Sequence, residues 1–582
     1  MSHNRTRPKR ALIRTALGLG VVLAAVAPVA LAEDHAKPPK PAPTLTFIAD
    51  TGGHRAAVRA LAFSPDGKRL YSAGDDKVIH VWDVGAKQSE KRIYLTAGAG
   101  GFGRITALAL TPDGRQLIAA SDPRPQCKEG FACPFLRLVE VETGRVRHMF
   151  TGEHDQVVTA IAVAPDGRRF VSFDAVGKGT IWDLENRWPV AHLFSHSDAV
   201  TRAAYAPDGR TIWSASRDWR LVAWSAESGI VIRDLVGHTA PVLGFAISRD
   251  GRRLASGDAS GTIRQWETRT GRLTGQFAHK GGPAATLTYL DDGKALAIKA
   301  TVVDAMSGKR LWSLQSAVVG GYQVTALSPD GALQAIGTSR GAIALVDPPT
   351  GKSRGVLEGR GRAIGAVDVA RNRQSVSWSF AELRRPVEAN PAVSWQLTLP
   401  HKTWFGLFDQ PLGEPQRTAA RETSSPSPTG MRFATGTFGP KPFASPPKGA
   451  VVARARSAGA PALSVTGSTD QTLRFLTGET DDLIATLLPT LAGAYALWTP
   501  EGFVADAKPR GIDLGWLVSD KPHAQPVYVP VSRVPSAVRR SLISDALRRA
   551  KPAEVTAEMR SRLQNDIEAA AGDLKSKHTA GN

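Results

Sequence analysis

The stretch GHRAAVRALAFSPDGKRLYSAGDDKVIHVWD, residues Gly53–Asp83, decides the fold. It contains three short runs in which apolar residues alternate with polar ones, and turns rich in Pro, Gly and Asp separate the runs. This alternation predicts short antiparallel strands joined by hairpins. A segment of this length cannot bury its own apolar faces, so we expect the unit to stack on further copies of itself.

The turn Ser64-Pro65-Asp66-Gly67 recurs along the chain. Pro presets φ for such a turn, and Gly supplies the positive φ that a tight turn needs. The Asp residues that precede the Gly follow one another at intervals of 47, 53, 42, 42, 42 and 38 residues. A period near 42 residues corresponds to four short strands, the size of a propeller blade. The seven turns end at Gly67, Gly114, Gly167, Gly209, Gly251, Gly293 and Gly331.

Two of these units carry the same four residue types at matching places, namely His54, Ser72, Asp76 and Trp82, and His196, Ser214, Asp218 and Trp224. Their pattern resembles that of the WD40 repeat family. The resemblance covers about residues 45–357 and implies an all-β, WD40-type β-propeller. It also implies that the four side chains form a hydrogen-bonded tetrad that braces the blade, because buried polar atoms must be paired. Other units depart from the pattern: Val176 and Ser260 stand where the third and fifth units would have the Asp.

We expect the propeller to span residues 45–488, with regular blades over 45–357 and degenerate blades over 358–488. Seven units are clear and one or two are poor. A single ring of seven to nine four-stranded blades and a ring plus a partial second sheet therefore both remain open. The apolar run Leu45–Ile48 is the candidate strand that completes the last blade.

The chain after the repeats divides into an extension, residues 489–534, and a tail, residues 535–578. Residues 493–520 resemble the segment that follows the repeats in bacterial WD40 proteins, including those fused to caspase-like domains, but no protease domain accompanies it here. The tail has apolar residues at helical spacing, which predicts short α-helices whose apolar stripe is covered either by the propeller or by a partner. Val538, Leu542 and Leu547 mark a first short helix. The stripe lies on a second helix after Pro552 and consists of Val555, Met559, Leu563, Ile567 and Leu574.

Residues 1–32 have the composition of a signal peptide. Basic residues without acidic ones precede an apolar stretch, and Ala30-Leu31-Ala32 predicts cleavage after Ala32. An uncleaved membrane anchor is the alternative, but Gly18, Gly20 and Pro28 interrupt the apolar stretch. We expect a periplasmic or secreted protein that begins with a Pro-rich linker, residues 33–44, and has no later segment with the ~20 apolar residues of a membrane span.

Cys127 and Cys133 are the two cysteines of the chain, and they lie in an insertion of the second unit. Two cysteines this close across a Gly-containing loop of an exported protein predict a disulfide. A ring this short contributes roughly 2 kcal/mol, so the disulfide staples a loop rather than the fold. A metal site would need two more ligands, and no His or acidic cluster lies beside these cysteines in the sequence.

The net charge of +20 is unevenly distributed. Loss of residues 1–32 would remove five basic residues and leave +15, and Gly351–Ala460 alone holds 16 Lys and Arg against 7 Asp and Glu. A basic face can attract an anionic envelope component, although surplus charge can also merely solvate the surface. Nucleic acid is not expected as a partner, because no basic and aromatic recognition motif is present.

Catalytic signals are weak. The sequence Gly337-Thr338-Ser339-Arg340-Gly341 matches Gly-x-Ser-x-Gly, but it lies where other units have a hairpin turn instead of a strand-to-helix elbow. The histidines at blade entries fit tetrads better than metal ligands. We therefore assign no catalytic, cofactor-binding or metal-binding residue and expect no enzyme.

The function that these patterns favour is that of an exported, non-catalytic scaffold. It would bind protein partners, whose identity the sequence leaves unknown, or an envelope component. The alternative is an enzyme or a propeller that binds a small ligand or a metal in its central channel. A propeller is a platform for many functions, so the fold alone does not choose between the two.

Overall fold

The computed structural model describes residues 43–579, apart from residues 96–102, 123–135, 291–292, 300, 314–320, 360–363, 370–374, 381–393, 399–400, 403–408, 411–415, 419–450, 458–461, 469–470, 491–493, 507–511 and 520–524. The predicted signal peptide, most of the linker, and Cys127 and Cys133 lie outside the described residues. The cleavage site and the disulfide therefore stay predictions.

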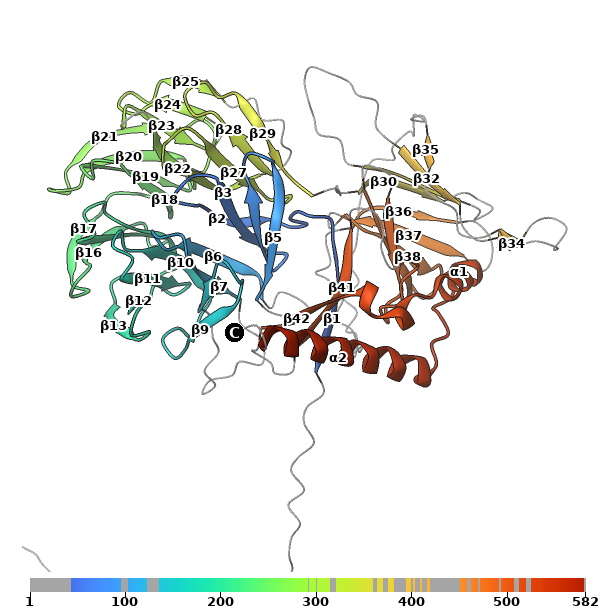
Figure 1. The fold of residues 1–582 in the computed structure, drawn as a ribbon. Coiled ribbons are helices and arrows are strands. Elements are labelled where there is room, and N and C mark those ends of the chain that lie inside the picture. The colour runs from blue at the N-terminus through green and yellow to red at the C-terminus, as the bar shows by residue number, and fades with distance from the viewer. Residues whose placement is uncertain are drawn as a thin grey trace, which may run out of the picture. The chain divides into compact units, whose positions relative to one another are not determined.

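Seven four-stranded antiparallel sheets follow one another in the described part of the chain, each built from four consecutive strands. Figure 1 shows them in colours from blue to yellow. Their strands are β2 (Val58–Phe63), β3 (Arg69–Gly74), β4 (Val78–Asp83) and β5 (Gln88–Tyr94); β6 (Ile105–Leu110), β7 (Gln116–Ser121), β8 (Leu136–Glu140) and β9 (Val146–Phe150); β10 (Val158–Val163), β11 (Arg169–Asp174), β12 (Gly179–Asp183) and β13 (Pro189–Leu193); β14 (Val200–Tyr205), β15 (Thr211–Ser216), β16 (Leu221–Ser225) and β17 (Val231–Leu235); β18 (Val242–Ile247), β19 (Arg253–Asp258), β20 (Thr262–Glu267) and β21 (Leu273–Ala278); β22 (Leu287–Leu290), β23 (Ala295–Ile298), β24 (Thr301–Asp304) and β25 (Arg310–Ser313); and β26 (Tyr322–Leu327), β27 (Gln334–Thr338), β28 (Ile343–Val346) and β29 (Ser353–Leu357).

Neighbouring sheets share their hydrophobic cores. Tyr71 of the first sheet packs in one cluster with Leu117 of the second, and similar clusters link each further sheet to the next. Trp82 of the first sheet shares a cluster with Ile343 of the seventh. The seven sheets therefore close into a β-propeller, and each sheet is one blade, as the repeats predict.

The recurring turn has the geometry that its residues favour. The N–H of Gly67, at φ +69°, donates to the carbonyl of Ser64 at 2.9 Å. The Ser64 hydroxyl donates to Asp66 Oδ1 at 2.6 Å. Turns of neighbouring blades also meet, because a Cβ added to Gly114 would lie 3.0 Å from Cδ of Pro65. The turn thus closes a hairpin within its own blade and also contacts the turn of the neighbouring blade.

Further sheets are built from the chain after the seventh blade. The strands β30, β31, β32 and β35 form one sheet, the strands β36 to β40 form a second, and β41 and β42 join the N-terminal strand β1 in a third. A short hairpin pairs β33 with β34. Their bounds are β1 (Thr44–Asp50), β30 (Ile364–Val369), β31 (Ser375–Phe380), β32 (Ser394–Thr398), β33 (His401–Lys402), β34 (Asp409–Gln410), β35 (Gln416–Thr418), β36 (Val451–Arg456), β37 (Leu463–Ser468), β38 (Leu473–Thr477), β39 (Leu483–Pro489), β40 (Tyr495–Trp498), β41 (Asp513–Ser519) and β42 (Val527–Pro530).

The prediction that Leu45–Ile48 completes the last blade of the ring is wrong. This run belongs to β1, which pairs antiparallel with β41 over all seven of its residues. Phe47 is buried there against Trp498 and Trp516, at 5.4 Å between ring centroids in both pairs. Every blade of the ring already has four strands of its own, so the apolar run finds its burial in the C-terminal sheets instead.

The tail forms two helices, α1 (Arg540–Arg549) and α2 (Ala557–Thr579), after the short 3₁₀ turns η2 (Val531–Arg533) and η3 (Pro535–Ala537). Helix α1 buries Ile543 and Leu547 in a core shared with the sheet of β36 to β40. Helix α2 buries Leu563 and Ile567 in a core shared with β1, β41 and β42. The apolar stripe of the tail is therefore covered by the chain's own sheets. None of the described helices combines the length and apolar character that crossing a membrane requires.

Candidate functional site

The polar cluster of the first blade is assembled from four places in the chain. His54 precedes β2, Ser72 lies on β3, Asp76 lies in the turn after β3, and Trp82 lies on β4. His54 Nδ1 lies 2.8 Å from Asp76 Oδ2, and His54 Nε2 lies 2.7 Å from Ser72 Oγ. The Trp82 indole N–H donates to the same Ser72 Oγ at 2.6 Å. The four side chains thus form one continuous hydrogen-bonded chain inside the blade.

Asp76 is held as a carboxylate. Burial alone would raise its pKa, but the neighbouring His54 and the hydrogen bond from its imidazole lower the pKa below the ordinary 3.8. The backbone N–H of Arg55 donates to the same carboxylate at 3.1 Å. A negative charge therefore persists at this nearly enclosed position.

The fourth blade repeats this arrangement. His196 lies 2.7 Å from both Asp218 Oδ2 and Ser214 Oγ, and the Trp224 indole donates to Ser214 Oγ at 2.8 Å. Burial raises the pKa of Asp218, yet the hydrogen bond and charge of His196 outweigh it and lower the pKa to about 2. The residues that the resemblance singled out in both blades are thus brought together.

The third and fifth blades complete the same cluster with an acid that the sequence reading missed. His154 Nδ1 lies 3.0 Å from Asp174 Oδ2, and His238 Nδ1 lies 2.7 Å from Asp258 Oδ2. In both blades the acid is the last residue of the second strand. It lies two residues before the position where the repeat pattern predicts the Asp, which Val176 occupies in the third blade and Ser260 in the fifth. An Asp 20 residues after the His, in place of 22, is the signal that could have found it.

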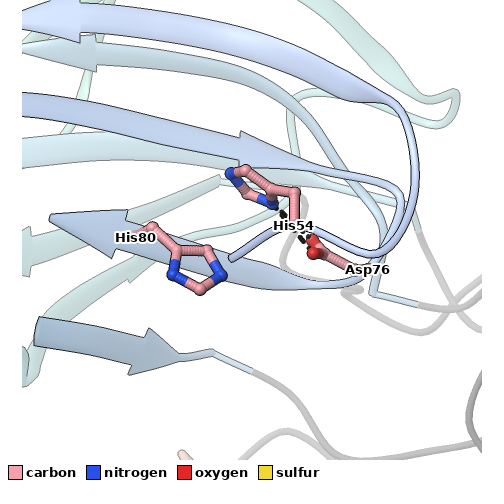
Figure 2. A group of neighbouring side chains, drawn as sticks. All are labelled: His54, Asp76 and His80. Atoms are coloured by element: carbon pink, nitrogen blue, oxygen red, sulfur yellow. Dashed lines mark hydrogen bonds and ion pairs between the residues drawn. The ribbon is translucent and has the colours of Figure 1, made fainter. Parts of the chain in front are cut away.

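His80 distinguishes the first blade from the others. It lies on β4, is fully buried, and places its ring edge to face on His54, with centroids 4.5 Å apart. Its Nδ1 lies 3.1 Å from Ser89 Oγ, whereas its buried Nε2 has no hydrogen-bond partner. Figure 2 shows His80 beside His54 and Asp76. One ligand atom from each of these three side chains lies within 4.8 Å of those of the other two.

The His80 imidazole is neutral. Burial and the neighbouring His54 and Arg92 lower its pKa well below 6.5, and Asp76 opposes that shift only in part. The sequence reading passed over His80 because it is no member of the tetrad. The sequence feature that could have identified His80 is its position two residues before Trp82. The third, fourth and fifth blades have Thr180, Val222 and Arg264 at this position, so only the first of these blades has a histidine there.

The Gly-x-Ser-x-Gly sequence lies in a hairpin. Ser339 follows β27 and precedes β28, and its hydroxyl accepts the N–H of Gly321 at 3.0 Å. A hydrolase nucleophile of this pattern occupies a strand-to-helix elbow. The local structure around Ser339 is therefore that of a blade turn.

The outer strands of the first two blades contact the C-terminal sheets. On β5, Arg92 pairs with Asp50 at 3.4 Å, and Tyr94 stacks on Tyr528 with ring centroids 5.9 Å apart. On β9, the N–H of Val146 donates to the side chain of Gln525 at 2.9 Å. The chain itself thus engages the edges of blades one and two.

The outer strands of the third and fourth blades, β13 and β17, and the residues that flank them expose large apolar side chains. Each is the last strand of its sheet and pairs with one neighbour. The turn that leads into β17 contacts β13, because a Cβ on Gly229 would lie 3.0 Å from both Ala191 Cβ and Leu193 Cδ2. We call this surface the outer apolar edge. Its exposed residues are Trp188, Val190, Phe194, Ile230, Val231, Ile232 and Val236.

Comparison with known proteins places WD40 repeats in this chain. Residues 45–83 and 229–267 match the family model of the WD domain, G-beta repeat. Apoptotic protease-activating factor 1 of Rattus norvegicus is 28% identical over 144 residues, 25% of this chain and 10% of that protein. WD repeat-containing protein 55 of Homo sapiens is 47% identical over 49 residues, 8% of this chain and 13% of that protein. The chain thus spans about a tenth of the length of these curated relatives.

Proposed function

We propose that this propeller, which contains WD40 repeats, is an exported, non-catalytic scaffold that binds a protein partner along its outer apolar edge. The observation that carries the proposal is the set of large, exposed apolar side chains on and beside the outer strands of two neighbouring blades. Trp188 is 61% exposed, and Phe194, Ile230 and Val236 are each 68% exposed. Large exposed apolar patches on a globular protein mark interaction sites.

The edge strands also indicate how a partner binds. β13 and β17 each have one side without a paired strand in their sheets. An extended peptide segment can add to such an edge, so that main-chain hydrogen bonds supply affinity and side-chain contacts supply specificity. Trp188 and Phe194 are suitable anchors, because aromatic side chains dominate the binding energy of protein interfaces.

The comparisons support a binding role. Residues 45–83 and 229–267 match the WD domain, G-beta repeat, and a propeller is a platform that serves many binding functions. The first and second blades use their edges for contacts within the chain, through residues such as Arg92 and Val146. The third and fourth blades are therefore the better candidates for an external partner.

The test is affinity capture with crosslinking in the envelope of the source cell. The triple variant W188S/F194S/I230S is expected to lose at least ~30-fold in partner affinity, since aromatic anchors at interfaces typically contribute 2 kcal/mol or more. The matched control is M306S/L311S, because Met306 and Leu311 of the sixth blade are 62% and 53% exposed. Equal capture by wild type and the triple variant would overturn the proposal. Capture that both variants retain and that salt abolishes would identify an anionic envelope polymer as the partner.

Export is a separate part of the proposal and has its own measurement. The basic, then apolar composition of residues 1–32 supports it. Intact mass of the protein from an envelope fraction should correspond to a chain that begins at Glu33. Recovery of the full-length chain in the cytoplasm would contradict export, but it would leave the proposed binding at the outer apolar edge unaffected.

A further inference from the structure

We propose that His54, Asp76 and His80 bind a divalent transition-metal ion, of which Zn²⁺ is the representative, inside the first blade. This site is independent of the outer apolar edge and its partner. It goes beyond the tetrad, because the tetrad supplies only two of the three donors.

The donor set and its spacing favour such an ion. Two imidazole nitrogens and a carboxylate are ligands that Zn²⁺ and related ions prefer. His54 Nδ1 and Asp76 Oδ2 are 2.8 Å apart, a separation compatible with two ligands on one ion, and the full set lies within 4.8 Å. Tetrahedral coordination with metal–ligand distances of about 2.0–2.2 Å places the ligand atoms roughly 3.3–3.6 Å apart, so the farthest atoms must approach by up to about 1.5 Å. Rotation of the carboxylate and a small tilt of the His80 ring can supply that movement.

The unpartnered nitrogen of His80 is an independent pointer to a ligand. His80 is fully buried, and its Nε2 has no hydrogen-bond partner, although buried polar atoms are generally paired. His80 lies on β4, and Figure 2 shows its ring beside His54 and Asp76. A metal ion at this place would satisfy the nitrogen that the protein leaves unsatisfied.

Both histidines are already held through the ring nitrogen that would not bind the ion, and the Asp76 carboxylate is held by backbone N–H groups. His54 Nε2 lies 2.7 Å from Ser72 Oγ, and His80 Nδ1 lies 3.1 Å from Ser89 Oγ. The Arg55 N–H orients the Asp76 carboxylate at 3.1 Å. Such contacts fix the tautomer and orientation of ligating side chains. A shift of the His54 proton from Nδ1 to Nε2 frees Nδ1 for the ion without net loss of a proton.

The fourth blade provides an internal comparison. Its tetrad has the same contacts, with His196 at 2.7 Å from Asp218 Oδ2, but Val222 stands where the first blade has His80. The aliphatic side chain cannot coordinate, so the same fold exists there without a third donor. The fourth blade therefore shows that the tetrad forms without a third donor. The substitution H80V makes the first blade resemble the fourth in this respect.

A metal ion would stabilise the seven-bladed propeller near the point where the chain enters and leaves it. His54 follows Gly53, and a Cβ added to Gly53 would lie 2.1 Å from the backbone nitrogen of Gly359. Coordination would tie this entry segment to β4 through His80. We therefore expect the ion to stabilise the closed ring.

The test uses the purified chain, stripped with a chelator and titrated with Zn²⁺ and with Co²⁺ as a spectroscopic substitute. Wild type is expected to bind one ion per chain at the site, with a higher melting temperature and the visible absorption of Co²⁺ bound by nitrogen and oxygen. Residues that only orient ligands change metal affinity by about 10–100-fold, so H80V is expected to weaken binding by at least ~100-fold.

Two controls keep the result interpretable. H80V should retain the circular dichroism spectrum of the chelator-treated wild type, since a valine occupies this place in the fourth blade. H192V should retain wild-type metal affinity, because His192 is a partly exposed histidine of the third blade, 3.4 Å from Glu153. Absence of binding by wild type, or equal affinity in wild type and H80V, would overturn the proposal.

Discussion

The imidazole rings of His54 and His80 meet edge to face, with centroids 4.5 Å apart and planes inclined by 72°. His54 is engaged on both nitrogens, by Asp76 and by Ser72. His80 is engaged on one. Two buried histidines with different hydrogen bonding therefore share one blade, and the difference can be measured.

Stability should depend on pH through His80. Its pKa in the folded chain is well below 6.5, because of burial and of its neighbours His54 and Arg92. Between that lowered value and 6.5 only the unfolded chain binds the proton, so stability falls as the pH decreases below about 6.5. H80V should remove up to ~1.4 kcal/mol per pH unit of this slope. Urea unfolding between pH 7.5 and 5.5, in chelator, measures it, and identical slopes in both proteins would contradict the assignment.

Asp174 should be the acidic residue that stabilises the polar cluster of the third blade. D174A leaves His154 Nδ1 without its partner at 3.0 Å and also frees the N–H groups of Val176 and Lys178. An unsatisfied buried donor costs about 1–3 kcal/mol, so the free energy of unfolding should fall by at least that amount. V176A is the control and should change it by no more than ~0.5 kcal/mol, because Val176 is 55% exposed. The assignment fails if the two variants unfold at the same urea concentration.

Closure of the ring should depend on Gly53. A Cβ at this position would lie 2.1 Å from the nitrogen and 2.6 Å from Cα of Gly359, which are backbone atoms that cannot rotate away. We expect G53A to destabilise the propeller by about 1–3 kcal/mol through overpacking. G572A in α2 is the matched substitution, because a Cβ there meets nothing within 4 Å. It should be neutral or stabilise the chain by up to ~1 kcal/mol. Thermal unfolding of both variants tests the pair.

Strand β1 should support the C-terminal sheets. Phe47 packs on Trp498 and Trp516, so F47A should cost about 3–5 kcal/mol. The loss should appear as a change in tryptophan fluorescence and as earlier proteolysis of the C-terminal sheets. L311A, at an exposed position of the sixth blade, serves as the control. A loss of protection confined to the seventh blade would instead indicate that β1 completes the ring.

The sequence by itself determined the repeating unit. The turn Ser64-Pro65-Asp66-Gly67 and the alternation around it act within a few residues, so their effect on backbone conformation is readable without any tertiary contact. The same holds for the helical spacing of the tail. The full tetrads of the first and fourth blades were also readable, because all four of their residues keep one spacing along the chain.

Only the tertiary structure decided which side chains and strands that are distant in the sequence come into contact. Asp174 and Asp258 reach the histidines of their blades from the end of a strand, because different backbone positions can deliver a carboxylate to the same point in space. The partner of β1 lies more than 400 residues away in β41, and the burial of Phe47 beside two tryptophans selects it over the ring. His80 is an ordinary strand residue in the sequence, and its unpaired nitrogen arises only when the folded blade excludes water from it. Local propensity acts along the chain, whereas pairing and burial depend on the complete fold.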